Sequence, residues 1–301
     1  MCQIGIRYGK LKYNVSNNTR RRSHQNHNSE VIFMKKGIDA SEHQGNINFA
    51  AVKAAGIEFA MIRAGYGWTY EDKKFEQNVN GFLSAGIKVG AYWFIYATNV
   101  NEAIQNADKC IEALSKFKGA FTFPIGCDYE YDSDSYSEKQ GVKQSKATRT
   151  AIIEAFCDRL EEAGYYVSAY LNKDYIANKL NYNELTQFDL WLAHWDVEKP
   201  YRECGMWQNS SKLNISGTTF DSDIAYKDYE QIITGAGLNH TAKAAAPAPQ
   251  PVKFQTYYVR KGDTLTAIAN RFGTTIQQIA VDNNIKNVNL IYVAQPLKIR
   301  C

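Results

Sequence analysis

The sequence lacks the cysteine and histidine patterns that hold metals in proteins. Its six cysteines are widely spaced and include no Cys-x-x-Cys pair, and the histidines between residues 34 and 239, His43 and His194, do not have metal-motif spacing. Because the cysteines also show no framework spacing, we expect free thiols in a reduced compartment rather than disulfides. We therefore expect neither a metal ion nor another cofactor.

Long apolar runs and phosphate-binding loops are also missing. The first 33 residues are rich in Asn, Ser and Arg and contain no apolar stretch of the signal-peptide kind, and no later segment is long and apolar enough to span a membrane. Neither a Walker loop nor a GxGxxG pattern occurs. We expect a soluble monomer with no membrane insertion and no nucleic-acid partner. Residues 1–33 are expected to form a basic disordered extension, with Met34 as a candidate true start.

Charge is unevenly distributed along the chain, although the net charge is only +4. Residues 34–240 hold 21 basic and 28 acidic side chains, whereas residues 253–301 hold seven basic and two acidic ones. Between them, alternating Ala and Pro favour an extended spacer. The pattern predicts two modules with different partners, namely a larger domain at 34–236, a linker at 237–254 and a small domain at 255–301.

Short apolar segments alternate with amphipathic helical patterns in the larger domain. The helical patterns cover 48–56, 75–86, 101–117 and 146–164, and several end in Ala-Gly, a helix C-cap. This rhythm predicts parallel βα units, and about eight strands predict an α/β fold of the TIM-like (β/α) barrel kind. Little room for helices remains after residue 190, so we expect an irregular barrel whose last strands are joined by loops. The predicted strands are 37–41, 58–67, 87–97, 121–130, 165–172, 188–195, 204–210 and 218–226.

The chemistry of a βα barrel collects at the C-terminal ends of its strands. At those ends the predicted strands deliver four carboxylates, one guanidinium and several aromatic or amide side chains. Aromatic platforms with carboxylates suit a sugar-cleaving groove, because sugar rings stack through apolar faces and hydrogen-bond through their hydroxyls. The candidates are Asp39, Arg63, Tyr66, Tyr96, Asp128, Glu130, Tyr170, Asn172, His194, Trp195, Gln208 and Asp221.

Asp128 and Glu130 follow the apolar run of a buried strand. Residues two apart on a strand leave the same face, roughly 7 Å apart. This estimate does not choose between a retaining glycosidase, with carboxyl groups about 5 to 5.5 Å apart, and an inverting one, at about 6.5 to 9.5 Å. An isolated Asp-x-Glu pair more often bonds helix termini or nearby cations. Asp39 and Asp221 on other strand ends favour a catalytic cluster, in which repulsion should raise the pKa of at least one member.

Seven segments in a fixed order carry a resemblance to a known family: GIDASEHQGNINF, FAMIRAGYG, GIKVGAYWF, CDYE, LWLAHW, WQNSS and FDSDIAY. Residues 35 to about 232 resemble glycoside hydrolase family 25, the Chalaropsis-type N-acetylmuramidases. The resemblance implies an irregular βα barrel that hydrolyses the β-1,4 bond between N-acetylmuramic acid and N-acetylglucosamine in peptidoglycan. It also implies Glu130 as general acid/base, Asp128 as its partner, and Asp39 and Asp221 as the other acidic residues of the site. The candidates for substrate binding are then Arg63, Tyr66, Tyr96, Tyr170, Trp195 and Gln208.

The chemistry implied by this resemblance is substrate-assisted. Glu130 would protonate the leaving oxygen while the acetamido oxygen of the substrate attacks the anomeric carbon, and Asp128 would orient that amide. Two positions depart from the family pattern, with Trp93 in place of a frequent His and Asp223 in place of a usual Asn. Chitinases share the barrel and the chemistry, but their strand motif needs an Asp where this chain has Gly126, so chitinase is the weaker interpretation.

Other classes stay open as alternatives. One is a wall-binding protein whose barrel has lost activity, although the retained acidic set argues against it. Another is a wall amidase or peptidase, which would need zinc-binding histidines or a Cys/His pair. The missing signal peptide favours a phage endolysin, held in the host cytoplasm until it is released to the cell wall, over a bacterial autolysin of the same activity.

The C-terminal stretch TYYVRKGDTLTAIANRFGTTIQQIAVDNN predicts a strand, a turn and two helices, and a last strand follows at PLKI. This βααβ pattern resembles a LysM domain, although Val293 and Ala294 replace the usual Pro-Gly of the last turn. The resemblance implies binding of glycans that contain N-acetylglucosamine. Its basic charge would also suit anionic wall polymers, with a merely solvated basic face as the equal alternative. The implied glycan-binding residues are Gly262, Asp263, Thr264, Leu290 and Ile291.

Overall fold

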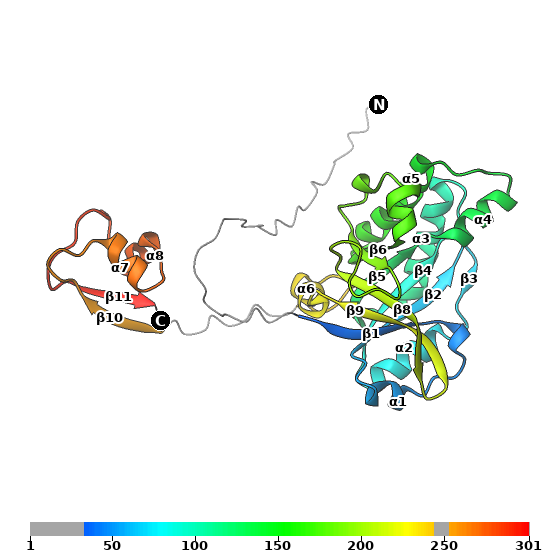
Figure 1. The fold of residues 1–301 in the computed structure, drawn as a ribbon, viewed down its shortest axis with the longest axis horizontal. Coiled ribbons are helices and arrows are strands. Elements are labelled where there is room, and N and C mark those ends of the chain that lie inside the picture. Colours follow the sequence, from blue (N-terminus) through cyan, green and yellow to red (C-terminus); the bar gives the residue numbers. More distant parts are fainter. Residues whose placement is uncertain (1–32, 244–252, 301) are drawn as a thin grey trace, which may run out of the picture.

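The computed structural model describes residues 33–243 and 253–300. In the first range eight strands close into a barrel in the order β1-β9-β8-β7-β6-β5-β4-β2, and β1 pairs with β2 to complete it. The short β3 is added outside β2 (Figure 1). The prediction of an α/β barrel is therefore confirmed. Its strands are β1 Lys35–Ala40, β2 Phe59–Tyr66, β3 Tyr70–Glu71, β4 Lys88–Phe94, β5 Phe121–Asp128, β6 Val167–Asn172, β7 Asp189–Ala193, β8 Met206–Ile215 and β9 Thr218–Ala225.

Six helices and three single turns accompany the barrel. Four helices lie where amphipathic patterns predicted them, whereas α4 and α6 were missed. The missed α4 reads YDSDSYSEK, a polar sequence without an apolar stripe, so periodicity alone does not reveal it. The helices are α1 Phe49–Ala54, α2 Phe75–Ser84, α3 Val100–Ser115, α4 Tyr131–Lys139, α5 Lys146–Glu162 and α6 Tyr229–Ala236; the single turns are η1 Glu42–Gln44, η2 Tyr175–Lys179 and η3 Tyr182–Glu184.

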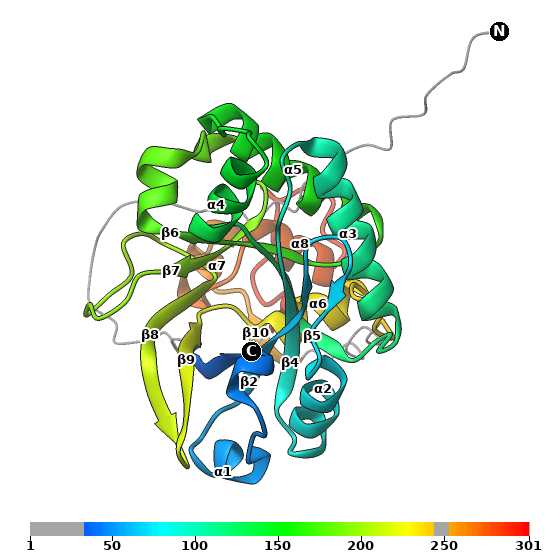
Figure 2. The same cartoon turned by 90° about the vertical axis from the view of Figure 1, so that its right-hand side faces the viewer.

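The last barrel strand runs against the others. Strands β1, β2 and β4 to β8 run parallel to one another, but β9 is antiparallel to both β8 and β1. A two-residue turn causes this, because Ser216 and Gly217 have positive φ angles of 53° and 86° and join β8 directly to β9. Figure 1 and Figure 2 both show the hairpin extending past the barrel beside α1. The prediction of a C-terminal strand end at Asp221 was therefore wrong, since Asp221 lies in the first half of β9.

Side chains pack in two layers, one inside the barrel and one between the strands and the helices. Phe59, Phe123 and Trp191 belong to the inner layer. Gly126 lies on the same inner face, where an added Cβ would stand 3.0 Å from the Tyr92 Cβ and 3.1 Å from the Trp191 ring. A larger residue at this position would therefore require Tyr92 or Trp191 to shift by a few tenths of an ångström.

Trp93, the first departure from the family pattern, lies in the outer layer. Its side chain is buried, and its indole Nε1 donates to the carbonyl oxygen of Gly67 at 2.9 Å. Because Trp93 faces away from the inside of the barrel, its indole does not contribute to a groove at the mouth. The substitution affects how β4 packs against the turn after β2.

Asn239 ties the segment after α6 to the barrel. Its side chain is fully buried, its Nδ2 donates to the carbonyl oxygens of Phe121 and Phe123 at 3.0 Å each, and its Oδ1 accepts from the Tyr166 amide at 2.7 Å. Packing thus continues past residue 237, where the sequence predicts the linker. Residues 244–252 of that linker, like residues 1–32 of the predicted extension, lie outside the described residues.

We expect Asn239→Ala to lower the free energy of unfolding by about 3 kcal/mol, because it leaves buried backbone groups without partners. Urea unfolding followed by circular dichroism measures the change. The matched control is Asn183→Ala, an exposed position at which we expect a change within about 0.5 kcal/mol. An equal effect of the two variants would show that the buried amide does not hold this segment.

The second range, residues 253–300, folds as the predicted βααβ unit. Its strands pair antiparallel, with Tyr257 opposite Leu297, and a small apolar core lies beneath them. Thr264 and Thr275 accept backbone hydrogen bonds at the starts of the two helices. Across both described ranges, no helix has the length and apolar character that crossing a membrane requires. The elements are β10 Phe254–Tyr258, α7 Leu265–Arg271, α8 Ile276–Asp282 and β11 Pro296–Arg300.

Candidate active site

Gln208 on β8 joins side chains from β1, β6, β9 and the segment after β7 at one mouth of the barrel. Its Nε2 donates to Asp39 Oδ2 at 2.7 Å and lies 3.5 Å from Asp221 Oδ2. Its Oε1 accepts from the Tyr170 hydroxyl at 2.9 Å and from the Trp195 indole at 2.8 Å. Asp39 and Asp221 also stand opposite one another in the β1–β9 register. Five of the predicted site residues are therefore brought together by one amide.

Asp128 and Glu130 enter the same mouth from β5. Asp128 is the last residue of the strand and 5% exposed, and its Oδ1 is buried with no hydrogen-bond partner in the described part of the chain. Glu130 lies two residues beyond Asp128, where its extended backbone precedes the first turn of α4. Tyr129 between them faces the outer layer and donates to Asp134 Oδ1 at 3.0 Å. The alternation predicted for a strand thus continues, although the strand itself ends at Asp128 rather than at residue 130.

Crowding and burial favour the protonated forms of these carboxyl groups. Burial raises the pKa of Asp128 well above its usual range, and the charge of Glu130 raises it further. Burial also raises the pKa of Glu130 to about 7, with added contributions from Asp132 and Asp221. The pKa of Asp39 is raised by burial and then by Asp223 and Asp221. Near neutral pH, Glu130 is therefore able to give up a proton and to take one back.

Asp223 is a fifth carboxyl group, which the sequence analysis noted as a departure but did not place in the site. It is 2% exposed, its Oδ1 accepts from the Trp191 indole at 2.8 Å, and its Oδ2 is buried without a partner among the described residues. Burial raises its pKa strongly, and Asp221 adds to the shift. The spacing was the available signal, because residues 221 and 223 share one face of β9.

Arg63 supports the wall of the mouth through ion pairs. Its Nε donates to Asp72 Oδ2 at 2.8 Å and one terminal nitrogen donates to Glu42 Oε1 at 3.1 Å, while the other lies 3.3 Å from His43 Nε2. The guanidinium carbon also lies 5.4 Å from the centre of the Tyr66 ring. Most donors of Arg63 are thus engaged within the protein, and the sequence analysis did not foresee Asp72 or Glu42 as its partners.

A row of tyrosines borders the mouth on the side of β2, β3 and α4. Tyr66 stacks on Tyr70 with ring centres 4.2 Å apart, meets Tyr96 edge-on at 5.7 Å, and Tyr96 lies 5.1 Å from Tyr136. Trp68, in the turn between β2 and β3, is 57% exposed. None of the hydrogen bonds in the described structure joins these rings to the carboxyl cluster, so they form a separate aromatic edge.

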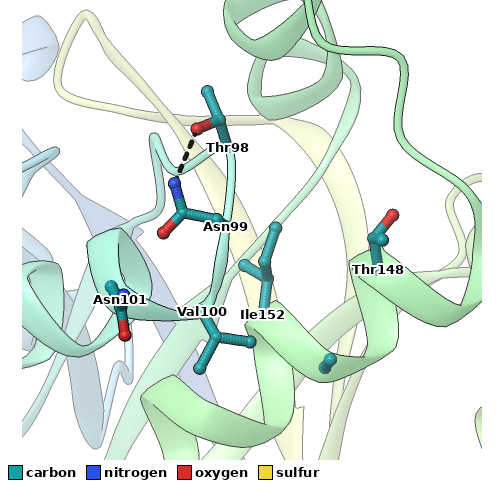
Figure 3. A pocket seen from close by; sticks show the side chains of 7 residues that line it. Thr98, Asn99, Val100, Asn101, Thr148 and Ile152 are labelled. Carbon is teal, nitrogen blue, oxygen red and sulfur yellow. Dashed lines mark hydrogen bonds between the residues drawn. The ribbon is translucent and has the colours of Figure 1, made fainter.

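A cavity of about 340 Å³ lies away from this cluster, between the first turns of α3 and α5 (Figure 3). Three of its polar side chains, those of Thr98, Asn99 and Thr148, are already used at the starts of the helices. Asn99 donates to Thr98 Oγ1 at 3.0 Å and accepts from the Glu102 amide at 3.1 Å, and Thr148 pairs with Ser145. These contacts cap helices, so the cavity is not the candidate site.

Comparison with known proteins connects this barrel to a family. The family described as Glycosyl hydrolases family 25 matches residues 38–218, which is more than half of the chain. The chain belongs to glycosyl hydrolases family 25. A LysM domain matches residues 257–300 as well, so both resemblances found in the sequence are confirmed. The order of modules is that of a family 25 domain followed by LysM.

Several named proteins are similar to the family 25 part of the chain. The chain is 48% identical over 208 residues to lysozyme M1 of Streptomyces globisporus, covering 62% of this chain and 66% of that protein. It is 26% identical over 191 residues to the autolytic lysozyme of Clostridium acetobutylicum, covering 63% and 54%. The modular autolysin LytC of Streptococcus pneumoniae, solved with a synthetic peptidoglycan ligand, matches with a TM-score of 0.55 to 0.56 at 26% identity, covering 64% and 47%. The chain thus spans about half to two thirds of these relatives.

The predicted glycan-binding residues of the LysM domain lie in two loops. Asp263 accepts from the Tyr257 hydroxyl at 2.6 Å and from the Arg260 amide at 2.8 Å, and Thr264 begins α7 by accepting from the Ala267 amide. Gly262 has a φ of +91°, which favours glycine in this turn. The side-chain oxygens of Asp263 and Thr264 are therefore engaged in hydrogen bonds within the domain that hold this loop and the start of α7. In the second loop, Leu290 is half exposed and Ile291 packs against the core.

Proposed function

We propose that this protein is an endo-β-1,4-N-acetylmuramidase, a lysozyme that hydrolyses the bond between N-acetylmuramic acid and N-acetylglucosamine in peptidoglycan. The observation that carries the proposal is the placement of Asp128 and Glu130 at one mouth of a family 25 barrel, with the pKa of Glu130 raised to about 7. Lysozyme and autolysin names among the relatives support the same substrate.

In the proposed reaction Glu130 acts first as an acid. It gives its proton to the glycosidic oxygen as the bond to the anomeric carbon breaks, and the acetamido oxygen of the substrate attacks that carbon. Asp128 acts in its ionised form, in which it accepts a hydrogen bond from the acetamido N–H and balances the positive charge of the cyclic intermediate. Glu130, now ionised, then removes a proton from water as the water opens the intermediate, which returns Glu130 to its acid form.

The electrostatic environment of this reaction depends on Asp39, Asp221 and Gln208. The two aspartates contribute to the raised pKa values of the Asp128–Glu130 pair, and Gln208 keeps Asp39 in place through its 2.7 Å hydrogen bond. We propose that the sugar chain stacks along the mouth and meets the side chains predicted to bind it. Those side chains are Arg63, Tyr66, Tyr96, Tyr170, Trp195 and Gln208.

The LysM domain is proposed to hold the enzyme on its polymeric substrate. A second binding unit raises the local concentration of the barrel at the wall without a new catalytic contact. Gly262, Asp263, Thr264, Leu290 and Ile291 remain the proposed glycan-binding positions. The biological role is a further proposal with two alternatives, a phage endolysin and a bacterial autolysin. The endolysin role stays a prediction of the sequence.

Analysis of the new ends in digested peptidoglycan tests the proposed activity. The purified protein should release soluble fragments whose new reducing ends are N-acetylmuramic acid. New reducing ends of N-acetylglucosamine, or new amino groups, would contradict the muramidase assignment. Binding to the wall without any release would support the alternative of an inactive wall-binding protein.

A change at Asp132 should move the pH dependence without touching the reacting groups. Asp132 is exposed in the first turn of α4, and its charge is the second-largest cause of the raised pKa of Glu130. Since catalysis needs protonated Glu130, kcat/KM should fall as the pH rises through about 7. Asp132→Asn lowers the pKa of Glu130, so this fall should move to lower pH while the plateau stays unchanged. A pH profile of both proteins measures the shift, and identical alkaline limbs would contradict the coupling.

A further inference from the structure

A second cavity, of about 540 Å³, lies between the segments that follow β6 and β7. Its floor is formed by Ile176 and Leu180, which belong to the apolar core, and its walls carry Tyr182, Tyr201 and Arg202. The chain enters the cavity through η2, a single turn of π-helix, a form often found at functional sites. We call this cavity the rim cleft.

Positive side chains around the rim cleft rest on aromatic rings. The Arg202 guanidinium lies 4.1 Å from the centre of the Tyr182 ring, and the Lys173 ammonium lies 5.1 Å from the centre of the Tyr201 ring. Among the ion pairs and hydrogen bonds of the described residues, none uses the guanidinium of Arg202 or the ammonium of Lys173. These two cations are held in place but keep their hydrogen-bond donors available. Glu184 also lines the cleft and brings the opposite charge.

The rim cleft borders the acidic mouth on two sides. On one side, Tyr201 meets His194 edge-on at 6.3 Å, and the next residue, Trp195, bonds Gln208 in the carboxyl cluster. On the other side, Tyr131, the neighbour of Glu130, lies 5.2 Å from Tyr175, which precedes the floor residue Ile176. The cleft is therefore connected to the mouth through His194 and Tyr131, each of which is one residue away from a residue of the mouth.

We propose that the rim cleft binds the acidic peptide stem that substitutes the N-acetylmuramic acid units of the wall. This inference rests on the proposed function, because the stem is attached to the sugar beside the bond that is cut. The Arg202 guanidinium offers a stem carboxylate two parallel hydrogen bonds, and the Lys173 ammonium adds a second positive charge. The surface that the cleft exposes is mainly polar, so the peptide is held chiefly through its carboxylates and its backbone.

Titration of the full-length chain with a synthetic stem peptide containing D-glutamate tests the site directly. The wild-type chain serves as the host, because the peptide carries no glycosidic bond that the enzyme could cut. We expect Arg202→Glu to weaken peptide binding at least tenfold, and Arg202→Lys, which keeps the charge, to restore most of it. Lys118→Glu, the same charge change at an exposed position on the loop before β5, should leave binding unchanged. No binding to the host, or equal binding by Arg202→Glu, would overturn the proposal.

A second measurement reads the effect on turnover. Both substrates are peptidoglycan freed of covalently attached anionic polymers, one with its stems and one with the stems removed by an amidase. Arg202→Glu should lower kcat/KM about tenfold on the substrate with stems, through a higher KM, and should leave kcat/KM on the substrate without stems unchanged. Lys118→Glu should change neither value. Equal losses on both substrates would overturn the proposal. If the wild-type chain cut neither substrate while still binding the peptide, the proposed muramidase function would fail and the peptide site would stand.

Discussion

Glu130→Gln should lower kcat on peptidoglycan by about 10³-fold, the loss expected when a general acid/base is removed. The amide has the shape of the carboxyl group but cannot give a proton to the glycosidic oxygen or take one from water. Burial and the charges of Asp132 and Asp221, which raise the pKa of Glu130 to about 7, have no equivalent effect on an amide. Release of reducing ends from purified walls measures the change.

Glu138→Gln is the matched control for this variant. Glu138 lies on the same helix, α4, but is exposed, so the same chemical change should leave kcat unchanged. Binding of Glu130→Gln to insoluble walls should also stay near the wild-type level, because the LysM domain is untouched. Near-normal turnover by a folded Glu130→Gln protein would remove Glu130 from the proposed mechanism.

Asp128→Asn should lower kcat by about 10² to 10³-fold and at the same time stabilise the fold. The lower kcat follows because a neutral amide does not balance the positive charge of the cyclic intermediate. The gain in stability follows because Asp128 Oδ1 is buried without a partner in the described part of the chain, an environment that penalises a charged carboxylate. At pH 7 we expect the free energy of unfolding to rise by about 1 to 3 kcal/mol.

The pH dependence of this stability difference has a definite sign. Folding raises the pKa of Asp128 above its ordinary value of 3.8, so the folded chain binds this proton more tightly than the unfolded chain. The protonated Asp128 therefore contributes fully to the free energy of unfolding below pH 3.8, and this contribution is lost as the pH rises through the folded pKa. The advantage of Asp128→Asn should be present at pH 7 and should vanish below pH 3.8. Urea unfolding at both pH values tests this, and an advantage that persists in acid would contradict it.

Local pattern was enough to predict much of the architecture. The apolar run before Asp128 predicted a buried strand, and alternation correctly placed Tyr129 on the opposite face from Asp128 and Glu130. Four amphipathic helices were predicted within a few residues of their observed ends, because helical periodicity is a property of neighbours in sequence. The same periodicity was blind to α4, whose polar residues carry no apolar stripe.

The tertiary structure decided what depends on partners far apart in the chain. The pairing of β9 with β1 brings Asp221 opposite Asp39, and it reversed the strand direction that the sequence predicted. The contacts of Gln208, the depth of Asp223 and the ion pairs of Arg63 follow from packing between strands that lie up to 169 residues apart.

The sequence by itself determined which carboxyl groups the protein has and which face of each strand they leave, because alternation along a strand is local. Only the closed barrel decided how deeply they are buried, which of them lie together, and so which one holds a proton near neutral pH. Burial and the distance between charges set a pKa, and both arise from the packing of the whole chain.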